Sequence, residues 1–182
     1  MSKALGMVEY TTVATGIQAA DLMVKTAEVD VVEAQTVCPG KYMVIISGDL
    51  SSVRASVDAA KTRYPDQLID SFVLGNPDES IYPAIYGAAE VEDAKALGVI
   101  ETFSSAAAVV AADTAAKTSN VQLVELRLAR GMCGKSYLLI TGDVAAVTAA
   151  IERARDAVGE DGMLLDSSVI PSPDIKLWQS IL

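Results

Sequence analysis

The sequence predicts an α+β protein built from two consecutive domains of the same kind, each an α/β sandwich. Two observations lead to this prediction. The chain repeats itself over nearly its whole length, and each copy passes through strand-like and helix-like stretches in the same order. At 182 residues the chain is long enough for two small domains. We expect them at residues 1–91 and 92–182, with the boundary in the acidic segment at residues 90–93.

The repeat is visible as matched motifs whose spacing grows slightly along the chain. The opening motif at residues 4–9, Ala-Leu-Gly-Met-Val-Glu, returns 92 positions later as Ala-Leu-Gly-Val-Ile-Glu. The second copy has two extra residues just before Gly134. Further matched pairs are Ala20-Asp21 with Ala112-Asp113, Lys25 with Lys117, Val29 with Val121, Gly40-Lys41 with Gly134-Lys135, Gly48-Asp49 with Gly142-Asp143, Asp70-Ser71 with Asp166-Ser167, and Pro77-Asp78 with Pro173-Asp174.

The first copy begins with an apolar stretch at residues 5–10 that predicts a strand. Residues 12–27 follow with helical spacing, and we expect a helix there. Its apolar residues on one face, which we expect to face the core, are Ile17, Ala20, Val24 and Ala27.

Two further strands are predicted at residues 29–37 and 41–47, joined by the turn Cys38-Pro39-Gly40. Proline presets φ and glycine accepts a positive φ, so this tripeptide favours a tight turn. Asp49 is expected to cap a helix that begins near Ser51. A fourth strand at 68–74 and a helical tail at 81–86 complete the copy. The order is βαββαβ, the ferredoxin-like arrangement, which by itself does not indicate a function.

The composition excludes several classes of function. The chain has no histidine, which removes Ser-His-Asp and Cys-His catalysis, and no Gly-rich phosphate motif appears. The formal net charge is −10, and the sequence has no block of basic residues. We therefore expect no nucleic-acid and no membrane partner. The two cysteines form no metal-binding pair and indicate an intracellular protein. We also expect no signal peptide and no membrane span.

The opening motif, the Ala-Asp-x-Met-Val-Lys of the first helix and the Gly-Asp-Leu or Gly-Asp-Val before the second resemble the bacterial microcompartment shell domain. Two fused copies resemble its tandem, trimer-forming class. The subtype that the sequence resembles is the T-type shell protein of propanediol-utilisation microcompartments. The segments that carry this likeness are residues 36–42, 70–74, 119–121 and 168–173.

This resemblance implies a homotrimer that forms a flat pseudo-hexameric tile, packed edge to edge with neighbouring shell proteins. The turn between the second and third strands would face a central pore. The residues expected to line it are Cys38, Pro39, Gly40, Lys41, Met132, Cys133, Gly134 and Lys135. Lys25 and Lys117 would lie at the edges between tiles, with their ammonium groups bonded to backbone carbonyls. The alternative is that both lysines are solvated helix residues.

The resemblance to the T-type relatives implies that Cys38 is an iron–sulfur ligand. Three copies of the chain would then hold one 4Fe-4S cluster. Thiolates are the usual ligands and four normally bind a cubane, so a three-fold axis leaves one iron for another ligand. The alternative is that Cys38 is a small buried residue. Cys133 departs from this pattern, and an inert loop residue, a redox-sensitive thiol and an additional ligand remain open for it.

Three functions follow from these observations. The first is a non-enzymatic shell tile in the cytoplasm whose pore cluster passes electrons across the shell, or delivers clusters to encapsulated redox enzymes. The second is a shell tile with an open pore for small metabolites and no cluster. The third is a ferredoxin-like ligand-binding regulatory protein. Because the acids Glu9 and Glu101 recur at equivalent places, we expect them to be structural rather than catalytic.

Overall fold

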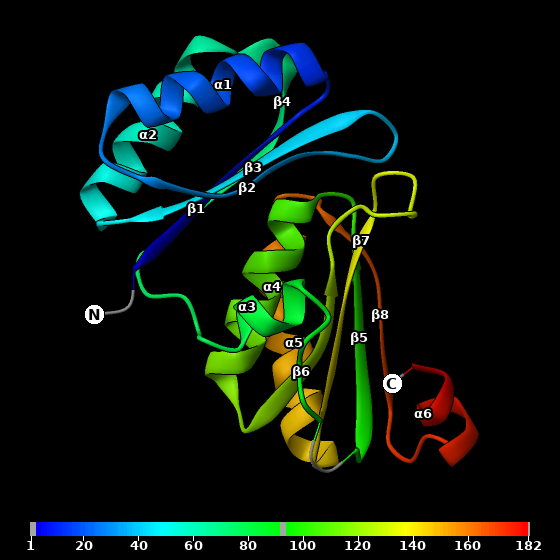
Figure 1. Ribbon diagram of the computed structural model, residues 1–182. Coiled ribbons are helices and arrows are strands. Elements are labelled where there is room, and N and C mark those ends of the chain that lie inside the picture. Colours follow the sequence, from blue (N-terminus) through cyan, green and yellow to red (C-terminus); the bar gives the residue numbers. More distant parts are fainter. Residues whose placement is uncertain (1–2, 92–93, 182) are drawn as a thin grey trace. The chain divides into compact units, whose positions relative to one another are not determined.

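A computed structural model describes residues 3–91 and 94–181. The chain forms two compact units, and Figure 1 shows their elements. Unit 1 contains residues up to Pro77 together with Ser104–Ala107 and Ala129–Lys135 from the second repeat. Unit 2 contains the remaining described residues. The domain boundary expected between residues 91 and 92 adjoins positions 92–93, which lie outside the described residues, and it stays a prediction.

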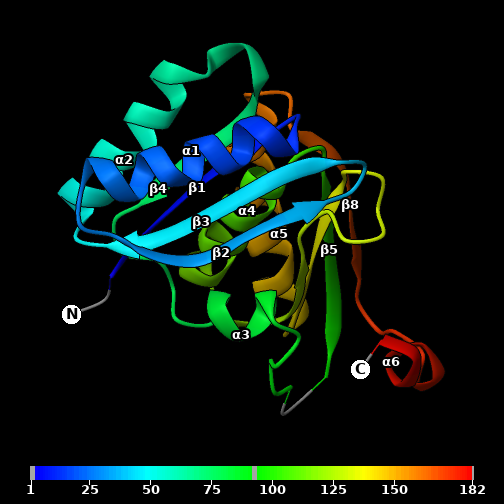
Figure 2. The same cartoon turned by 45° about the horizontal axis from the view of Figure 1, so that its top comes forward.

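Unit 1 contains the predicted βαββαβ order of the first repeat. Its antiparallel sheet has the strand order β2-β3-β1-β4, and Figures 1 and 2 show α1 and α2 together on one face of it. The elements are β1 (Ala4–Tyr10), α1 (Val13–Thr26), β2 (Asp30–Val37), β3 (Lys41–Gly48), α2 (Leu50–Arg63), a 3-10 turn (Pro65–Gln67) and β4 (Leu68–Leu74).

The buried face of α1 differs from the predicted one. Gly16, Ala19 and Met23 are buried against the sheet, whereas Ile17 and Val24 are 53% and 43% exposed. The helix carries apolar residues on two faces, and periodicity alone does not tell which face meets the core. Gly16 decides it, because a Cβ there would overlap the side chain of Tyr42, so the helix approaches β3 closely at this position.

The predicted position of Asp49 before α2 is confirmed, since the helix begins at Leu50. Asp49 occupies the N-cap position, but its side chain makes no capping hydrogen bond. Its carbonyl accepts the N–H of Val53 at 2.9 Å, which is the first bond of the helix.

Unit 2 repeats the sheet with the strand order β6-β7-β5-β8. Gly98 of β5 faces Val147 and Ile151 of α5, so by the alternation of strand side chains Leu97 points to the opposite face. There it packs with Trp178 of α6. The elements are α3 (Ile81–Ile85), β5 (Ala96–Thr102), α4 (Ser105–Thr118), β6 (Val121–Arg127), β7 (Ser136–Gly142), α5 (Val144–Gly159), β8 (Leu164–Ile170) and α6 (Ile175–Ile181).

The helical tail of the first repeat packs beyond its own sheet. Helix α3 contacts β6 in unit 2, and the N–H of Asp78, just before α3, donates to the Asp113 carboxylate of α4 at 2.8 Å. Across residues 3–91 and 94–181, the longest apolar helices fall short of what a bilayer span requires.

Candidate functional site

The turn of the first repeat forms as the sequence predicts. Val37, the last residue of β2, is paired with Lys41, the first residue of β3, and the N–H of Gly40 donates to the carbonyl of Val37 at 2.9 Å. Gly40 has a φ of 110°, a conformation that glycine adopts without strain. Cys38 is partly exposed at this turn, so its thiol is not sealed in the core.

The matching loop of the second repeat is longer and more strongly bent. It connects β6 to β7, and the N–H of Lys135 donates to the carbonyl of Met132 at 3.1 Å. Besides its glycines, Ala129 and Cys133 also have positive φ angles of 52° and 51°. Cys133 is exposed. The second copy, with its two extra residues, therefore has a longer loop where the first copy has a tight turn.

Within unit 1, the turn and the loop contact each other. The N–H of Cys38 donates to the carbonyl of Ala129 at 3.1 Å, and the ammonium of Lys41 donates to the carbonyl of Gly134 at 3.1 Å. A Cβ on Gly134 would lie 3.0 to 3.1 Å from Lys41 and Pro39, so this close approach favours glycine. The segments that we expected to line one pore are thus neighbours within a single chain.

A buried carboxylate, that of Glu9, bonds to Lys41 at the contact between the turn and the loop. Glu9 of β1 is 0% exposed and pairs with Lys41, whose ammonium lies 3.1 Å from Oε1. Its second oxygen accepts the backbone N–H of Ser105 at 2.9 Å. Burial raises the pKa of Glu9 above its ordinary value of 4.5, and the adjacent Lys41 opposes this rise. Glu9 therefore joins Lys41, which directly follows the Cys38-Pro39-Gly40 turn, to the first turn of α4.

A second acid, Asp70, lies beside Glu9 and also bonds to the start of α4. Asp70 of β4 is the cross-strand partner of Glu9, and it accepts a hydrogen bond from the hydroxyl of Ser104. The Ser104 hydroxyl also accepts the N–H of Ala107 at 3.0 Å, so Ser104 caps α4. Glu9 and Asp70 together, which we call the first acidic pair, hold the start of α4. The structural role that we expected for Glu9 agrees with these bonds.

Sequence reasoning missed Asp70, Ser104 and Ser105. Two serines directly before an apolar helical run are a recognisable N-cap signal, and this signal could have identified the start of α4. Ser104 bonds to Asp70, which is more than 30 residues away in sequence. Ser105 bonds to Glu9, which is more than 90 residues away. No local pattern indicates such partners.

The two candidate edge lysines are both paired along their own helices. Lys25 contacts Asp21 at 2.6 Å, and Lys117 contacts Asp113 at 2.7 Å. Each acid precedes its lysine by four residues, the spacing at which side chains of one helix face meet. Both lysines keep substantial exposure, so their edge role stays a prediction.

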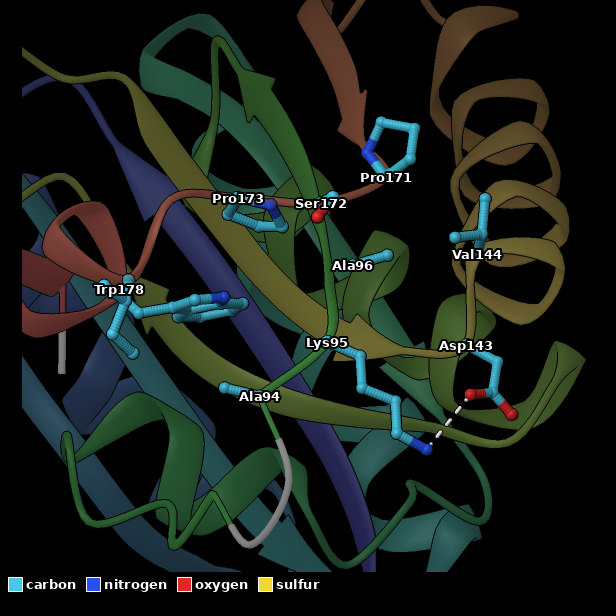
Figure 3. Close-up of a pocket in the computed structure, with 10 residues that line it drawn as sticks. Ala94, Lys95, Ala96, Asp143, Val144, Pro171, Ser172, Pro173 and Trp178 are labelled. Carbon is cyan, nitrogen blue, oxygen red and sulfur yellow. Dashed lines mark hydrogen bonds and ion pairs between the residues drawn. The ribbon is translucent and has the colours of Figure 1, made fainter.

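A further pocket that sequence reasoning did not identify lies in unit 2 (Figure 3). It has a volume of about 390 Å³ and lies between Trp178 of α6 and the segment Pro171-Ser172-Pro173 that follows β8. Lys95 points toward Asp143 across it, and their charged atoms are 3.1 Å apart. Since Lys95 is already paired, an anion would have to compete with Asp143 for it.

The chain is similar to known microcompartment proteins along its whole length. The BMC domain model matches residues 4–77 and 96–173. The chain is 40% identical to the bacterial microcompartment shell protein PduT of Citrobacter freundii, over 100% of this chain and 99% of that protein. It is 28% identical to the carboxysome assembly protein CcmO of Synechococcus elongatus, over 98% of this chain and 68% of that protein.

Solved structures agree with the fold. A microcompartment protein from Desulfitobacterium hafniense superimposes with a TM-score of 0.86 at 47% identity, covering 98% of this chain and 99% of that one. A fused, permuted hexameric shell protein of the RMM microcompartment has a TM-score of 0.66 at 20% identity and shares the fold, covering 87% of this chain and 82% of that one. Both repeats match the domain model, and a full-length relative is 40% identical. The chain therefore belongs to the BMC-domain family of bacterial microcompartment shell proteins, as a member with two such domains in tandem.

Proposed function

We propose that this protein is a non-catalytic tile of a microcompartment shell in the bacterial cytoplasm, in which three copies form a pseudo-hexamer around a central pore. The observation that carries the proposal is the contact between the Cys38–Pro39–Gly40 turn and the loop before β7. It brings equivalent segments of both repeats to one end of the fold, as a ring of six domains with a shared axis requires. Neighbouring shell proteins would be the other partners.

The finer part of the proposal is a 4Fe-4S cluster held by Cys38 of three copies. The residues fit such a group. Cys38 is partly exposed, and a Cβ on Gly40 would meet nothing within 4 Å, so there is open space beside Gly40 in the same turn. The backbone N–H groups of Cys38 and Gly40 are both bonded to carbonyls, and these bonds fix the turn that carries the thiol.

One chain does not offer a complete cluster site. Among residues 3–91 and 94–181, no group of three or more acids and cysteines is placed to hold a metal. Thiolates from several copies are therefore required, and Cys38 contributes one from each chain. Bound in this way, the cluster would supply one-electron transfer across the shell or be delivered to encapsulated redox enzymes.

Two cysteine variants test the cluster. Protein purified without oxygen is expected to be brown, with about four irons for every three chains. Cys38→Ser is expected to remove colour and iron while the oligomer persists, and the matched control Cys133→Ser is expected to keep both. A colourless wild-type protein with no iron would favour the open metabolite pore instead. Colour that persists in Cys38→Ser would refute the ligand assignment.

Electron microscopy tests the tile independently of the cluster. Concentrated protein is expected to form flat sheets or tubes with hexagonal packing. A protein that stays a single chain of 19.0 kDa at all concentrations would contradict the tile.

A further inference from the structure

The helices α1 and α4 occupy the same place in the two repeats, but their outer surfaces differ in exposure. Ile17 of α1 is 53% exposed, whereas Val109, 92 positions later, is 0% exposed. Thr12 is exposed and its counterpart Ser104 is buried. The side chain of Asp21 is 59% exposed and that of Asp113 is 9% exposed. One helix thus leaves uncovered the surface that the other has covered.

The contacts at the start of α4 involve residues of the first repeat. The first acidic pair, Glu9 and Asp70, accepts hydrogen bonds from the Ser105 N–H and the Ser104 hydroxyl. Farther along the helix, Asp113 accepts the N–H of Asp78 from the segment that follows the first repeat. These polar bonds therefore connect the first repeat and its tail to α4.

The second repeat carries the same donors and acceptors on its own sheet and tail. Glu101 of β5 and Asp166 of β8 are cross-strand partners, in the register that Glu9 and Asp70 have in the first repeat. We call them the second acidic pair. Asp166 is exposed, whereas Asp70 is half-buried. Asp174 follows the second repeat as Asp78 follows the first.

We propose that the second acidic pair of one copy binds the start of α1 in a second copy of this chain. In this contact Asp166 accepts the Thr12 hydroxyl, and Glu101 accepts the Val13 N–H. Asp21 of α1 accepts the Asp174 N–H of the same neighbour, and the neighbour covers Ile17. The proposal rests on the tile proposed above and names the residues that join its copies.

Three physical arguments identify the occupant as another copy. The surface of α1 matches the surface of α4 position by position, and the structure already shows which partner fits the latter. Carboxylates are favoured at a helix N-terminus, where the backbone N–H groups carry partial positive charge. A contact between different surfaces of identical chains is head-to-tail, and such contacts form a ring, as in the proposed trimer, when the rotation between copies closes.

The substitution Thr12→Asp separates assembly from folding. An aspartate is at least as good an N-cap residue as threonine, so α1 is expected to stay folded. In the assembled tile, however, the new carboxylate would face the second acidic pair, and like charges across an interface oppose binding. We expect at least a tenfold rise in the apparent dissociation constant of the oligomer, measured by sedimentation. Circular dichroism is expected to stay unchanged.

Two further variants complete the test. Ser51→Asp places the same charge in the exposed first turn of α2 and is expected to assemble like the wild type. Adding Asp166→Asn to Thr12→Asp removes one facing charge and is expected to restore part of the assembly. A Thr12→Asp variant that assembles like the wild type overturns this interface, and so does the absence of any restoration. Wild-type protein that remains a single chain refutes the tile itself, which is a different result.

Discussion

The two repeats place an acidic pair at the same register of the same sheet, but they differ in how deeply it is buried. Glu9 is fully buried and bonded within the chain to Lys41 and Ser105, whereas Glu101 is partly exposed. The strand neighbours Asp70 and Asp166 differ in the same way. The first pair is therefore the less accessible of the two, and we infer that the more exposed second pair also contacts a second copy of the chain.

The interiors of the repeats differ as well. In the first repeat Tyr10 and Tyr42 are paired across β1 and β3, and Gly16 leaves room for the Tyr42 ring. In the second repeat the paired residues are Thr102 and Ser136, and the helix position of Gly16 is taken by Ala108. The first repeat thus combines a small helix residue with a large strand residue, and the second repeat combines a larger helix residue with a small strand residue. Close packing requires this compensation of side-chain volumes.

The largest expected effect comes from removing the buried acid. Glu9→Ala leaves Lys41 and the Ser105 N–H without their carboxylate, and we expect a loss of about 3 to 5 kcal/mol in the free energy of unfolding. Because these bonds lie within one chain, the urea midpoint should fall equally at protein concentrations a hundredfold apart.

The matched variant Glu101→Ala sharpens the comparison between the two pairs. It is expected to shift mainly the protein concentration at which the oligomer dissociates, measured by sedimentation. If Glu9→Ala and Glu101→Ala respond identically to dilution, the distinction between an internal and an external pair is wrong.

A smaller effect is expected from filling the space beside Tyr42. Gly16→Ala overpacks the contact between α1 and β3 and should cost about 1 to 3 kcal/mol of stability in urea unfolding. Adding Tyr42→Ser recreates the residues that the second repeat has at these positions. The double variant should then lose less than the two single variants lose together. Ala108→Gly serves as the control, with a loss of about 1 kcal/mol from helix propensity alone. Strict additivity of the two single losses would contradict the proposed steric conflict.

The smallest expected effect is a pH dependence carried by Glu9. Burial raises its folded pKa above 4.5, so folding takes up a proton between the unfolded and the folded pKa. The stabilising contribution of this carboxyl group is complete below pH 4.5 and is lost as the pH rises through the folded pKa.

The comparison of wild type with Glu9→Gln isolates this contribution. The stability of the wild type relative to the variant should fall with rising pH above 4.5, by at most about 1.4 kcal/mol per pH unit. Urea unfolding across this range measures the difference. A difference that grows with rising pH would show that the ion pair with Lys41 outweighs burial.

The sequence predicted the order of the elements and the turn at Cys38-Pro39-Gly40 within one or two residues. It succeeded there because strand alternation, helical spacing and turn chemistry act over a few neighbouring residues. It failed to predict which face of α1 meets the core. Ile17 and Val24 form an apolar face with the same helical spacing as the face that is buried. It also missed Ser104 and Asp70, whose bond joins segments that are distant in sequence.

By itself, the sequence determined that the chain is a duplication, that each copy is a βαββαβ domain, and that the protein resembles a tandem shell protein, since motifs and periodicity are local and repeat visibly. Only the tertiary structure decided which residues of the two copies meet. The carboxylate of Glu9 reaches Ser105 across 96 positions, and Lys41 reaches Gly134 across 93. Such contacts depend on the path of the whole chain, because a buried acid is stable only where folding brings a cation and an N–H donor to it.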